Sequence, residues 1–215
     1  MTEFIFIRHG ETDWNRQQRF QGQIDVPLNP LGHEQARRLA KALAGEQVDV
    51  MVSSDLLRTR ETAAPLERTL ARQALLLPGL REQSFGVLEG LDLSGITARH
   101  PQLWSQWLRH DADYVLPEGE STSRFHARVL VAVRALALEH AGKTLAVVTH
   151  GGVLDMLWRT VHGTSLHGAR VCDIPNTGIN RLRWRGGTLD IVGWADAAHL
   201  EGLPQQPDTA PPVQA

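Results

Sequence analysis

The chain has 215 residues, a length typical of one large domain or of two very small ones, and a single unit of this size can bury a sizeable hydrophobic core. Hydrophobic residues make up 42% and charged residues 21%, which is close to the globular average and excludes a chain that is disordered throughout. The formal net charge of −2 provides no basic excess of the kind that binds nucleic acid or an anionic membrane surface, so we expect neither partner.

The first part of the chain alternates segments typical of strands with segments typical of helices. A continuous apolar run at 4–7 predicts a strand that is covered on both faces. Asn29 and Pro30 predict the start of an amphipathic helix, for which Gly45 is the stop signal. A second strand is predicted over 48–52.

The alternation then weakens. A helix after the second strand extends to about Ala64, and Pro65 either ends it or kinks it. A short third strand is predicted over 74–77. From about 83 to 123, glycines and prolines separate short helix-like pieces, one of them around Trp104. We interpret 83–123 as a small helical insertion over the core, because it lacks the apolar periodicity of an independent domain.

Regular alternation returns in the C-terminal part. Ser121 is expected to cap a long helix. An apolar strand is predicted over 145–148, followed by a turn at 150–152 and a helix over 153–161. Two β-like runs on either side of the glycine pair 186–187 predict a hairpin.

Together these elements predict an α/β fold, a three-layer α/β/α sandwich with a mainly parallel sheet. Residues 1–203 are expected to form a single domain, and the proline-rich residues 204–215 a disordered tail. The sequence has no signal peptide pattern and no run of ~18 apolar residues, so we expect a cytoplasmic protein with no membrane partner. A single cysteine, Cys172, excludes a disulfide framework.

Two histidines stand directly after predicted strands, and each is followed by glycine. His9 follows 4–7, with Arg8 before it, and His150 follows 145–148. Carboxyl ends of parallel strands meet at one edge of a sheet, where ligands bind in open α/β folds. Neutral imidazole is a nucleophile, and guanidinium matches phosphate oxygens. Taken alone, the pattern fits a purely structural role equally well, in which the His9 ring packs at the end of the strand and the Arg8 side chain points into solvent.

A second arginine can reach the same edge. Arg58 lies about one helical turn beyond the second strand, where it would by itself be a surface partner of Glu61. Arg60 faces elsewhere and is expected to be structural. With His9 and His150, the arginines would surround a phosphoryl group, and phosphoryl transfer depends mainly on such positioning and charge. Other histidines in polar surroundings are expected at the surface: His100, His110, His126, His140 and His199.

The order of these motifs resembles the histidine phosphatase (phosphoglycerate mutase-like) superfamily, over residues from about 3 to 193. The motifs that carry the resemblance are Arg8-His9-Gly10-Glu11-Thr12 with Asn15, Phe20-Gln21-Gly22 with Asp25, Pro27 and Leu28, Ser54-Asp55-Leu56 with Arg58 and Glu61-Thr62-Ala63, Glu82 with Phe85-Gly86 and Glu89-Gly90, Gly119-Glu120-Ser121, and His150-Gly151.

The resemblance implies a role for each matched residue. His9 would be phosphorylated in the reaction, and Glu82 would be the general acid and then the base that activates water. The insertion would overhang the active site and shape specificity through its aromatic residues. The phosphate pocket and its substrate contacts would consist of Arg8, Arg58, His150, Asn15, Gln21, Gly22 and Gly151.

The favoured function is hydrolysis of small phosphomonoesters through a phosphohistidine on His9. The alternative is a 2,3-bisphosphoglycerate-dependent phosphoglycerate mutase, but 82–86 lacks the arginine and tyrosine of the mutases that this chain resembles. A third hypothesis is a non-catalytic phosphate-binding module, although no catalytic position has been lost. We expect a small-molecule phosphomonoester as the partner, no metal and no cofactor. A homodimer remains open.

Overall fold

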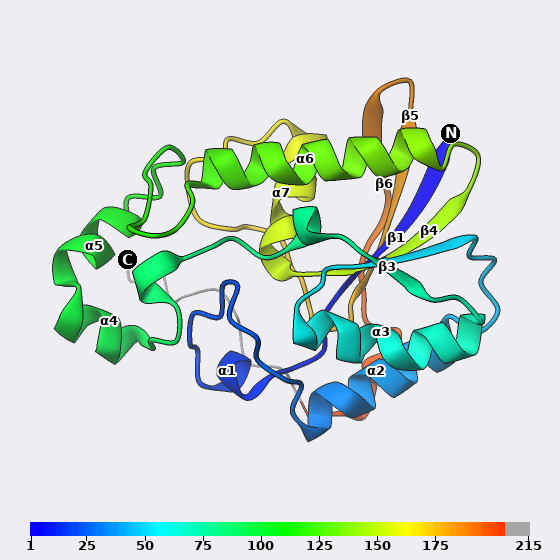
Figure 1. The fold of residues 1–215 in the computed structure, drawn as a ribbon, viewed down its shortest axis with the longest axis horizontal. Coiled ribbons are helices and arrows are strands. Elements are labelled where there is room, and N and C mark those ends of the chain that lie inside the picture. Colours follow the sequence, from blue (N-terminus) through cyan, green and yellow to red (C-terminus); the bar gives the residue numbers. More distant parts are fainter. Residues whose placement is uncertain (205–215) are drawn as a thin grey trace.

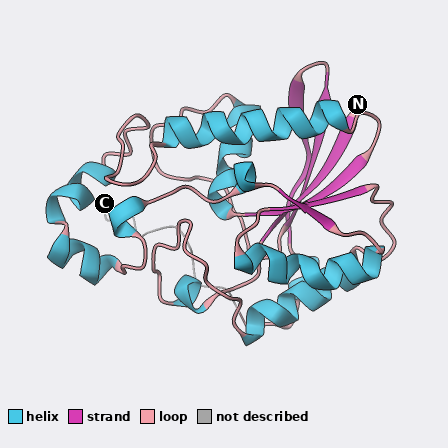
Figure 2. Ribbon diagram, viewed as in Figure 1, coloured by secondary structure: helices cyan, strands magenta, loops and turns pink. Residues whose placement is uncertain are grey.

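The computed structural model describes residues 1–204, which form a twisted six-stranded sheet with helices on both faces (Figure 1 and Figure 2). The strands are β1 (Thr2–Arg8), β2 (Val50–Ser53), β3 (Ala74–Leu76), β4 (Thr144–Thr149), β5 (Ile179–Arg185) and β6 (Thr188–Asp196). The helices are α1 (Asp13–Arg16), α2 (Pro30–Ala42), α3 (Leu57–Leu70), α4 (Leu93–Arg99), α5 (Pro101–Trp107), α6 (Thr122–Glu139) and α7 (Gly151–His162).

The strand order is β3-β2-β4-β1-β5-β6. The first four strands in this order are parallel, and in the central pair Phe4 lies beside Leu145 and Ile7 beside Val148. β5 and β6 form an antiparallel hairpin at one edge. The predictions of a mainly parallel sheet and a terminal hairpin are therefore confirmed. Because β2, β4 and β1 are parallel neighbours, the loops that follow them leave from the same edge of the sheet.

Successive residues of β1 point to opposite faces of the sheet, and a pair of helices covers each face. Phe4 and Phe6 pack with buried side chains of α6 and α7. Ile5 and Ile7 pack with those of α2 and α3, which lie on the other side in Figure 1. Fully burying each such side chain contributes about 1.5–3 kcal/mol. The predicted three-layer α/β/α arrangement is confirmed.

The segment between β3 and α6 projects beyond the carboxyl ends of the strands, at the left of Figure 1. It contains α4 and α5 and has a small hydrophobic cluster of its own, in which Leu88, Ile96 and Leu116 are fully buried. Partly buried aromatic rings surround this cluster: Phe20, Phe85, Trp104, Trp107 and Tyr114. The predicted small helical insertion is present.

Helix α3 passes through Pro65 and does not end near Ala64 as the sequence predicts. Proline removes one backbone N–H donor and disfavours a helix interior. The next residue, Leu66, is fully buried against the sheet, so packing of this face outweighs the lost hydrogen bond. The second strand also starts later than predicted, at Val50.

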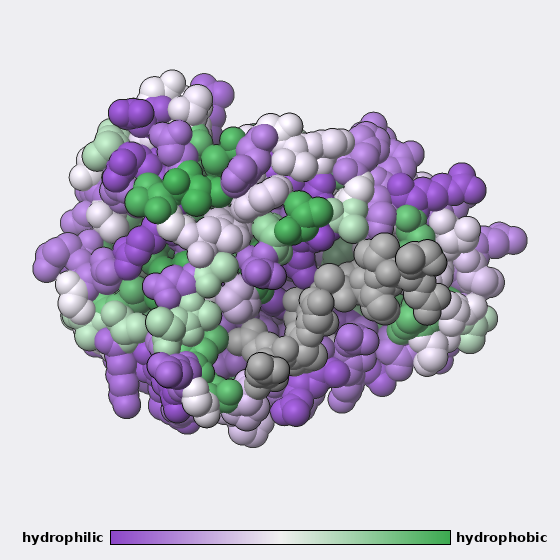
Figure 3. Space-filling view, turned by 180° about the vertical axis from the view of Figure 1, so that it is seen from behind, coloured by the Kyte–Doolittle hydropathy of each residue, from purple (hydrophilic) through white to green (hydrophobic). Residues whose placement is uncertain are grey.

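Hydrophilic and hydrophobic side chains are interspersed on the face shown in Figure 3. Exposed large hydrophobic residues are scattered over several elements, such as Leu75 and Leu76 on β3 and Val131 on α6. Within residues 1–204, none of the helices has the length and apolar character needed to cross a membrane. The predicted tail, 204–215, lies outside the described residues except for Pro204.

Ser121 caps α6 as predicted, because its hydroxyl accepts a hydrogen bond from the Arg124 N–H at 3.2 Å. We expect Ser121→Ala to lower the free energy of unfolding by about 1 kcal/mol, since the first turn loses its side-chain acceptor. Urea denaturation measures this loss. Ser123→Ala, just inside the helix, is the matched control and should change stability by less than about 0.5 kcal/mol. Equal losses in the two variants would contradict the capping role.

Candidate active site

His9 occupies the first position after β1 and is 3% exposed. Its backbone N–H donates to the Thr149 carbonyl at 2.9 Å, which ties the end of β1 to the end of β4. The ring Nδ1 lies 2.7 Å from the Gly10 carbonyl oxygen. Because a carbonyl oxygen can only accept, Nδ1 carries a proton, and in the neutral ring the lone pair is on Nε2.

The surroundings of His9 favour this neutral ring. Burial, followed by the charges of Arg58 and Arg8, holds the pKa of His9 well below 6.5. The hydrogen bond to the Gly10 carbonyl acts in the opposite direction and is outweighed. At pH 7 the Nε2 lone pair of His9 is therefore available for bond formation.

His150 lies beside His9, with 5.4 Å between the ring centroids. It is fully buried, and its Nε2 lies 2.9 Å from the Ser54 hydroxyl. Its Nδ1 has no hydrogen-bond partner within residues 1–204. Burial, and then the charges of Arg58, His9 and Arg8, holds the pKa of His150 well below 6.5, so this second imidazole is also neutral at pH 7.

Arg58 is fully buried in the first turn of α3. Its Nη1 donates to the Ile24 carbonyl at 2.9 Å and its Nη2 to the Gly22 carbonyl at 2.7 Å. The Nε of Arg58 has no partner among the described residues. Burial lowers the pKa of Arg58 to about 10, which still leaves the guanidinium charged at neutral pH. The alternative of a surface ion pair with Glu61 is wrong, because Glu61 instead accepts the backbone N–H of Leu28.

Arg8, at the end of β1, is 5% exposed, and its Nη1 donates to the Ile174 carbonyl at 2.6 Å. Burial, followed by the charge of Arg170, lowers the pKa of Arg8 to about 9. Arg8 is therefore a cation at neutral pH and does not point into open solvent.

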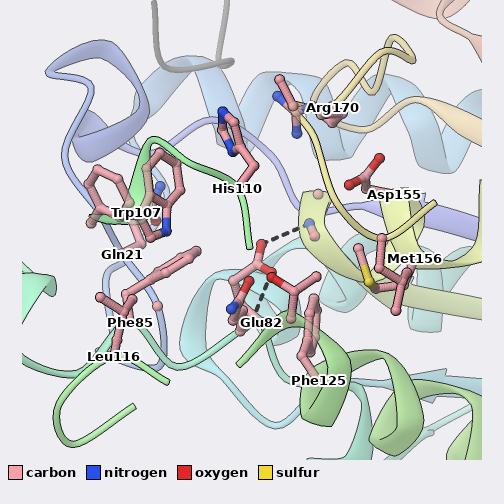
Figure 4. A pocket seen from close by; sticks show the side chains of 18 of the residues that line it. Gln21, Glu82, Phe85, Trp107, His110, Leu116, Phe125, Asp155, Met156 and Arg170 are labelled. Carbon is pink, nitrogen blue, oxygen red and sulfur yellow. Dashed lines mark hydrogen bonds between the residues drawn. The ribbon is translucent and has the colours of Figure 1, made fainter. Parts of the chain in front are cut away.

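Glu82 reaches the same place from the loop after β3. Its Oε1 accepts the Gln83 N–H at 2.9 Å and its Oε2 accepts the Gly152 N–H at 3.1 Å (Figure 4). Gly151 and Gly152, predicted as a turn, are instead the first turn of α7, with His150 at the N-cap. A Cβ atom on Gly152 would lie 2.1 Å from Oε1 of Glu82, so the absence of a side chain there allows the carboxylate to approach the helix.

Asn15 and Gln21 both line the cavity but also stabilise the loop between β1 and α2. Asn15 Oδ1 accepts the Thr12 N–H at 3.0 Å in the capping box of α1. Gln21 Oε1 accepts the Thr12 hydroxyl at 3.1 Å. In each case the amide oxygen is used within the protein, and the amide nitrogen is the group suited to a ligand.

Gly22 has a different role from its neighbour. Its φ of +49° is in the left-handed region, and a Cβ atom there would lie 2.0 Å from Oε1 of Glu89. Its carbonyl accepts from Arg58. Gly22 thus brings the backbone close enough to orient the guanidinium, and because it also lines the cavity, its expected contact with a substrate stays a prediction.

These side chains share one cavity of about 290 Å³, a size suited to a small ligand. Arg8, His9 and Arg58 line its inner end, and Gly151 lies at its wall. The insertion supplies one side through aromatic residues, and the loop between α7 and β5 supplies the other (Figure 4). Of the predicted site residues, His150 alone does not line the cavity, although its ring lies beside that of His9, which does.

Sequence reasoning missed several cavity residues. His110 was expected at the surface, but it lines the cavity beside Trp107, with 5.5 Å between the ring centroids. Gly152 could have been found from the sequence, because two successive glycines follow His150. Arg170 had none, because its place depends on the course of an irregular loop.

A separate group of exposed side chains, Asp111, Asp113 and His167, has ligand atoms within 4.8 Å of one another. His167 Nδ1 lies 3.2 Å from the Ala112 N–H, and Asp111 Oδ1 accepts the Asp113 N–H at 3.0 Å. Local hydrogen bonds account for this arrangement, and exposed acidic groups of this kind are common without a metal ion.

The family model of the histidine phosphatase superfamily (branch 1) matches residues 4–197. This chain belongs to that superfamily. A metal-independent phosphoserine phosphatase from Arabidopsis thaliana is 34% identical, over 94% of this chain and 85% of the relative. A probable phosphoglycerate mutase GpmB from Serratia proteamaculans is 32% identical, over 94% of this chain and 96% of the relative. The structure of YhfR from Bacillus stearothermophilus has a TM-score of 0.88 at 29% identity and covers 94% of this chain and 100% of its own.

Membership of the histidine phosphatase superfamily confirms the resemblance stated from the motifs and the expected class of enzyme. The match extends over nearly the whole predicted fold, including the insertion.

The two buried imidazoles predict how the stability of this histidine phosphatase depends on pH. In the unfolded chain histidines have ordinary pKa values near 6.5, whereas His9 and His150 take up protons in the folded state only at lower pH. Below pH 6.5 the unfolded chain therefore binds more protons, and the free energy of unfolding should decrease from about pH 7 to about pH 5.5.

Urea denaturation at the two pH values measures this decrease. His9→Asn should show a smaller decrease than the wild type, because one buried imidazole is gone. The exposed His33 provides the matched control, and His33→Asn should keep the full pH dependence. The same decrease in all three proteins would contradict a contribution from His9.

Proposed function

We propose that this chain hydrolyses small phosphomonoesters through a phosphohistidine on Nε2 of His9. The observation that carries the proposal is a buried, neutral imidazole whose Nδ1 proton is held by Gly10 and which lies among the guanidiniums of Arg58 and Arg8. Such a ring presents a lone pair at a place that attracts a phosphate dianion.

In the first step, Nε2 of His9 attacks phosphorus and the bond from phosphorus to the ester oxygen breaks. Glu82, in its protonated form, gives its proton to the departing alkoxide, and the product alcohol leaves. In the second step, the Glu82 carboxylate takes a proton from water. The resulting hydroxide attacks phosphorus, the bond to Nε2 breaks, and inorganic phosphate leaves with His9 neutral again.

Charge stabilisation is the main contribution of the protein to both steps. The guanidiniums of Arg8 and Arg58 are fixed in advance by backbone carbonyls and need little rearrangement when the substrate binds. The Arg58 Nε is a buried polar atom at the cavity that a phosphoryl oxygen can satisfy, and it has no partner in the described part of the chain.

The name of the Arabidopsis relative supports the phosphatase assignment and a reaction that needs no metal ion. We expect phosphate release from an aryl phosphate to be insensitive to EDTA and blocked by vanadate. The Serratia relative supports the second candidate, a phosphoglycerate mutase. Isomerisation of 3-phosphoglycerate that is faster than phosphate release would favour the mutase over the phosphatase.

The nucleophile is tested by trapping the intermediate. With a phosphorus-labelled substrate, the wild-type protein should form an acid-labile phosphoryl adduct, and His9→Ala should form none because the attacking atom is absent. His33→Ala, an exposed histidine on α2, is the control and should label like the wild type. An acid-labile adduct on the His9→Ala protein would show that another residue is the nucleophile.

Glu82 is tested through the glycine that accommodates it. Glu82→Gln should lower kcat by ~10²–10⁴ because the amide cannot donate the required proton. Gly152→Ala should also lower kcat, by at least ~10², because its Cβ would displace the carboxylate. Gly45→Ala is the control and should leave kcat unchanged, because a Cβ atom at Gly45 meets nothing within 4 Å.

The double variant decides whether Gly152 acts through Glu82. Gly152→Ala combined with Glu82→Gln should be no slower than Glu82→Gln alone, since the displaced group is already inactive. A further ~10²-fold loss in the double variant would mean that Gly152 serves the site in another way.

A further inference from the structure

The backbone that carries Glu82 is held by an arginine that does not line the cavity. Arg128 lies on α6, about two turns beyond the N-cap Ser121, and is partly buried. Its Nη1 donates to the carbonyls of Gly79 and Arg81, each at 3.0 Å, and its Nη2 donates to the Glu82 carbonyl at 3.2 Å. One guanidinium therefore binds both the backbone that leads to Glu82 and the carbonyl of Glu82 itself.

Other side chains bind the carbonyls of the same loop. The Leu80 carbonyl accepts the Thr149 hydroxyl at 2.9 Å. Gln23 Nε2 donates a second hydrogen bond to the Glu82 carbonyl at 3.2 Å. Backbone carbonyls that are buried outside regular elements need such partners. Arg128 supplies three of these bonds, so its loss would release more of this backbone than the loss of either other donor.

A carboxylate fixes the orientation of the guanidinium. Arg128 Nη2 donates to Glu120 Oε1, and Nε donates to Glu120 Oε2 at 3.3 Å. Glu120 Oε1 also accepts the backbone N–H of Ser84 at 3.0 Å, so this ion pair reaches the chain on both sides of Glu82. The guanidinium carbon lies 5.0 Å from the centroid of the Phe125 ring, which lines the cavity. Charge, planar hydrogen bonds and an aromatic contact therefore all order Arg128.

The place of the Glu82 carboxylate depends on this backbone. Glu82 has a flexible side chain, so its bonds with the N–H groups of Gln83 and Gly152 require a correctly placed Cα. The loop also packs directly on α6, because a Cβ atom on Gly79 would lie 3.0 Å from Cβ of Ala132. A displacement of about 1 Å can cost ~10² in rate. Releasing the loop from α6 would therefore affect proton transfer by Glu82 and leave the phosphate pocket in place.

We propose that Arg128 is a positioning residue, which holds Glu82 where its carboxyl group reaches the leaving oxygen and then the attacking water. Arg128 itself touches neither the substrate nor the phosphate. A guanidinium suits this role because its donors lie in a fixed plane and can serve several carbonyls and a carboxylate together. This inference rests on the proposed function, in which Glu82 is the acid and the base, and adds a residue outside the cavity to it.

The test varies the leaving group, because a good leaving group departs without a proton from Glu82. The substrates are phenyl phosphate and dinitrophenyl phosphate, whose leaving groups are a poor one and a good one. Single-turnover formation of the phosphohistidine isolates the first step. Arg128→Gln should slow this step ~10- to 100-fold with phenyl phosphate, because the acid is misplaced. With dinitrophenyl phosphate the rate should change little, and Glu82→Gln should show the same selectivity.

Three further variants separate positioning from general damage. Arg128→Lys should recover part of the rate with phenyl phosphate, because the charge remains without the planar fork. Arg134→Gln removes the same charge from an exposed position of α6 and is the matched control, which should behave like the wild type with both esters. Arg128→Gln added to Glu82→Gln should cause no further loss, since the misplaced group is already inactive.

The folding of the variant protein is addressed by removing both charges. Arg128→Gln leaves the partly buried Glu120 carboxylate without its cation, which lowers stability. The double variant Arg128→Gln with Glu120→Gln has no unpaired charge and should show the same selective loss with phenyl phosphate. An equal loss with both esters would mean that Arg128 supports the fold in general and would overturn the inference. An unchanged rate with phenyl phosphate would also overturn it.

A structural measurement separates this inference from the proposed reaction. In a crystal structure of the Arg128→Gln protein, the Glu82 carboxylate should have left the Gly152 N–H. If the wild-type protein forms no phosphohistidine from either ester, the proposed function fails, while the crystal structure still decides whether Arg128 positions Glu82. A carboxylate that keeps its bond to Gly152 in the variant would refute the positioning role.

Discussion

The chemistry of this site depends on the burial of four basic side chains in one place. Arg8, His9, Arg58 and His150 are all at most 5% exposed, and burial is the largest cause of the lowered pKa in each. The same cause has opposite consequences for the two residue types, because their ordinary pKa values differ. The imidazoles are neutral at pH 7, whereas the guanidiniums stay cationic. In the proposed reaction, this single physical effect would supply both the attacking atom and the positive charges that bind the phosphate.

Backbone geometry maintains this arrangement without bulky supporting side chains. Carbonyl groups of Gly10, Gly22 and Ile174 orient an imidazole and two guanidiniums, and they come from segments far apart in the sequence. Glycines permit these approaches: a side chain on Gly22 would collide with Glu89, and one on Gly152 with Glu82. The parallel pairing of β1 with β4 brings the contributing loops to a common edge. The precision of the site thus comes from main-chain contacts, which are less variable than side-chain conformations.

Site residues next to regular strands could be predicted from the sequence, whereas those in irregular loops could not be predicted from local patterns. Arg8, His9 and His150 could be placed because each adjoins a buried strand, and the strand order of such sheets brings their ends together. Glu82 lies in an irregular loop, where only the register of known motifs pointed to it. Arg170 depends on the path of a loop held by Arg159, a tertiary interaction that has no local signature.

At two positions, tertiary packing outweighs the local preference of a proline or a glycine. A proline suggested that α3 ends early, yet the buried face of the helix continues past it. Two glycines after His150 suggested a turn, but they begin α7 and allow the Glu82 carboxylate to reach the helix N-terminus. In both cases the preference of one residue is worth less than the contacts of the element that contains it.

The insertion has a hydrophobic cluster separate from the two that cover the sheet. Its members, such as Leu88 and Ile96, pack among themselves and against aromatic rings that face the cavity. Substitutions there alter the wall that meets the organic part of a ligand while leaving the layers around His9 intact. Such a division would let a changed insertion select a different substrate while the proposed reaction at His9 stays the same.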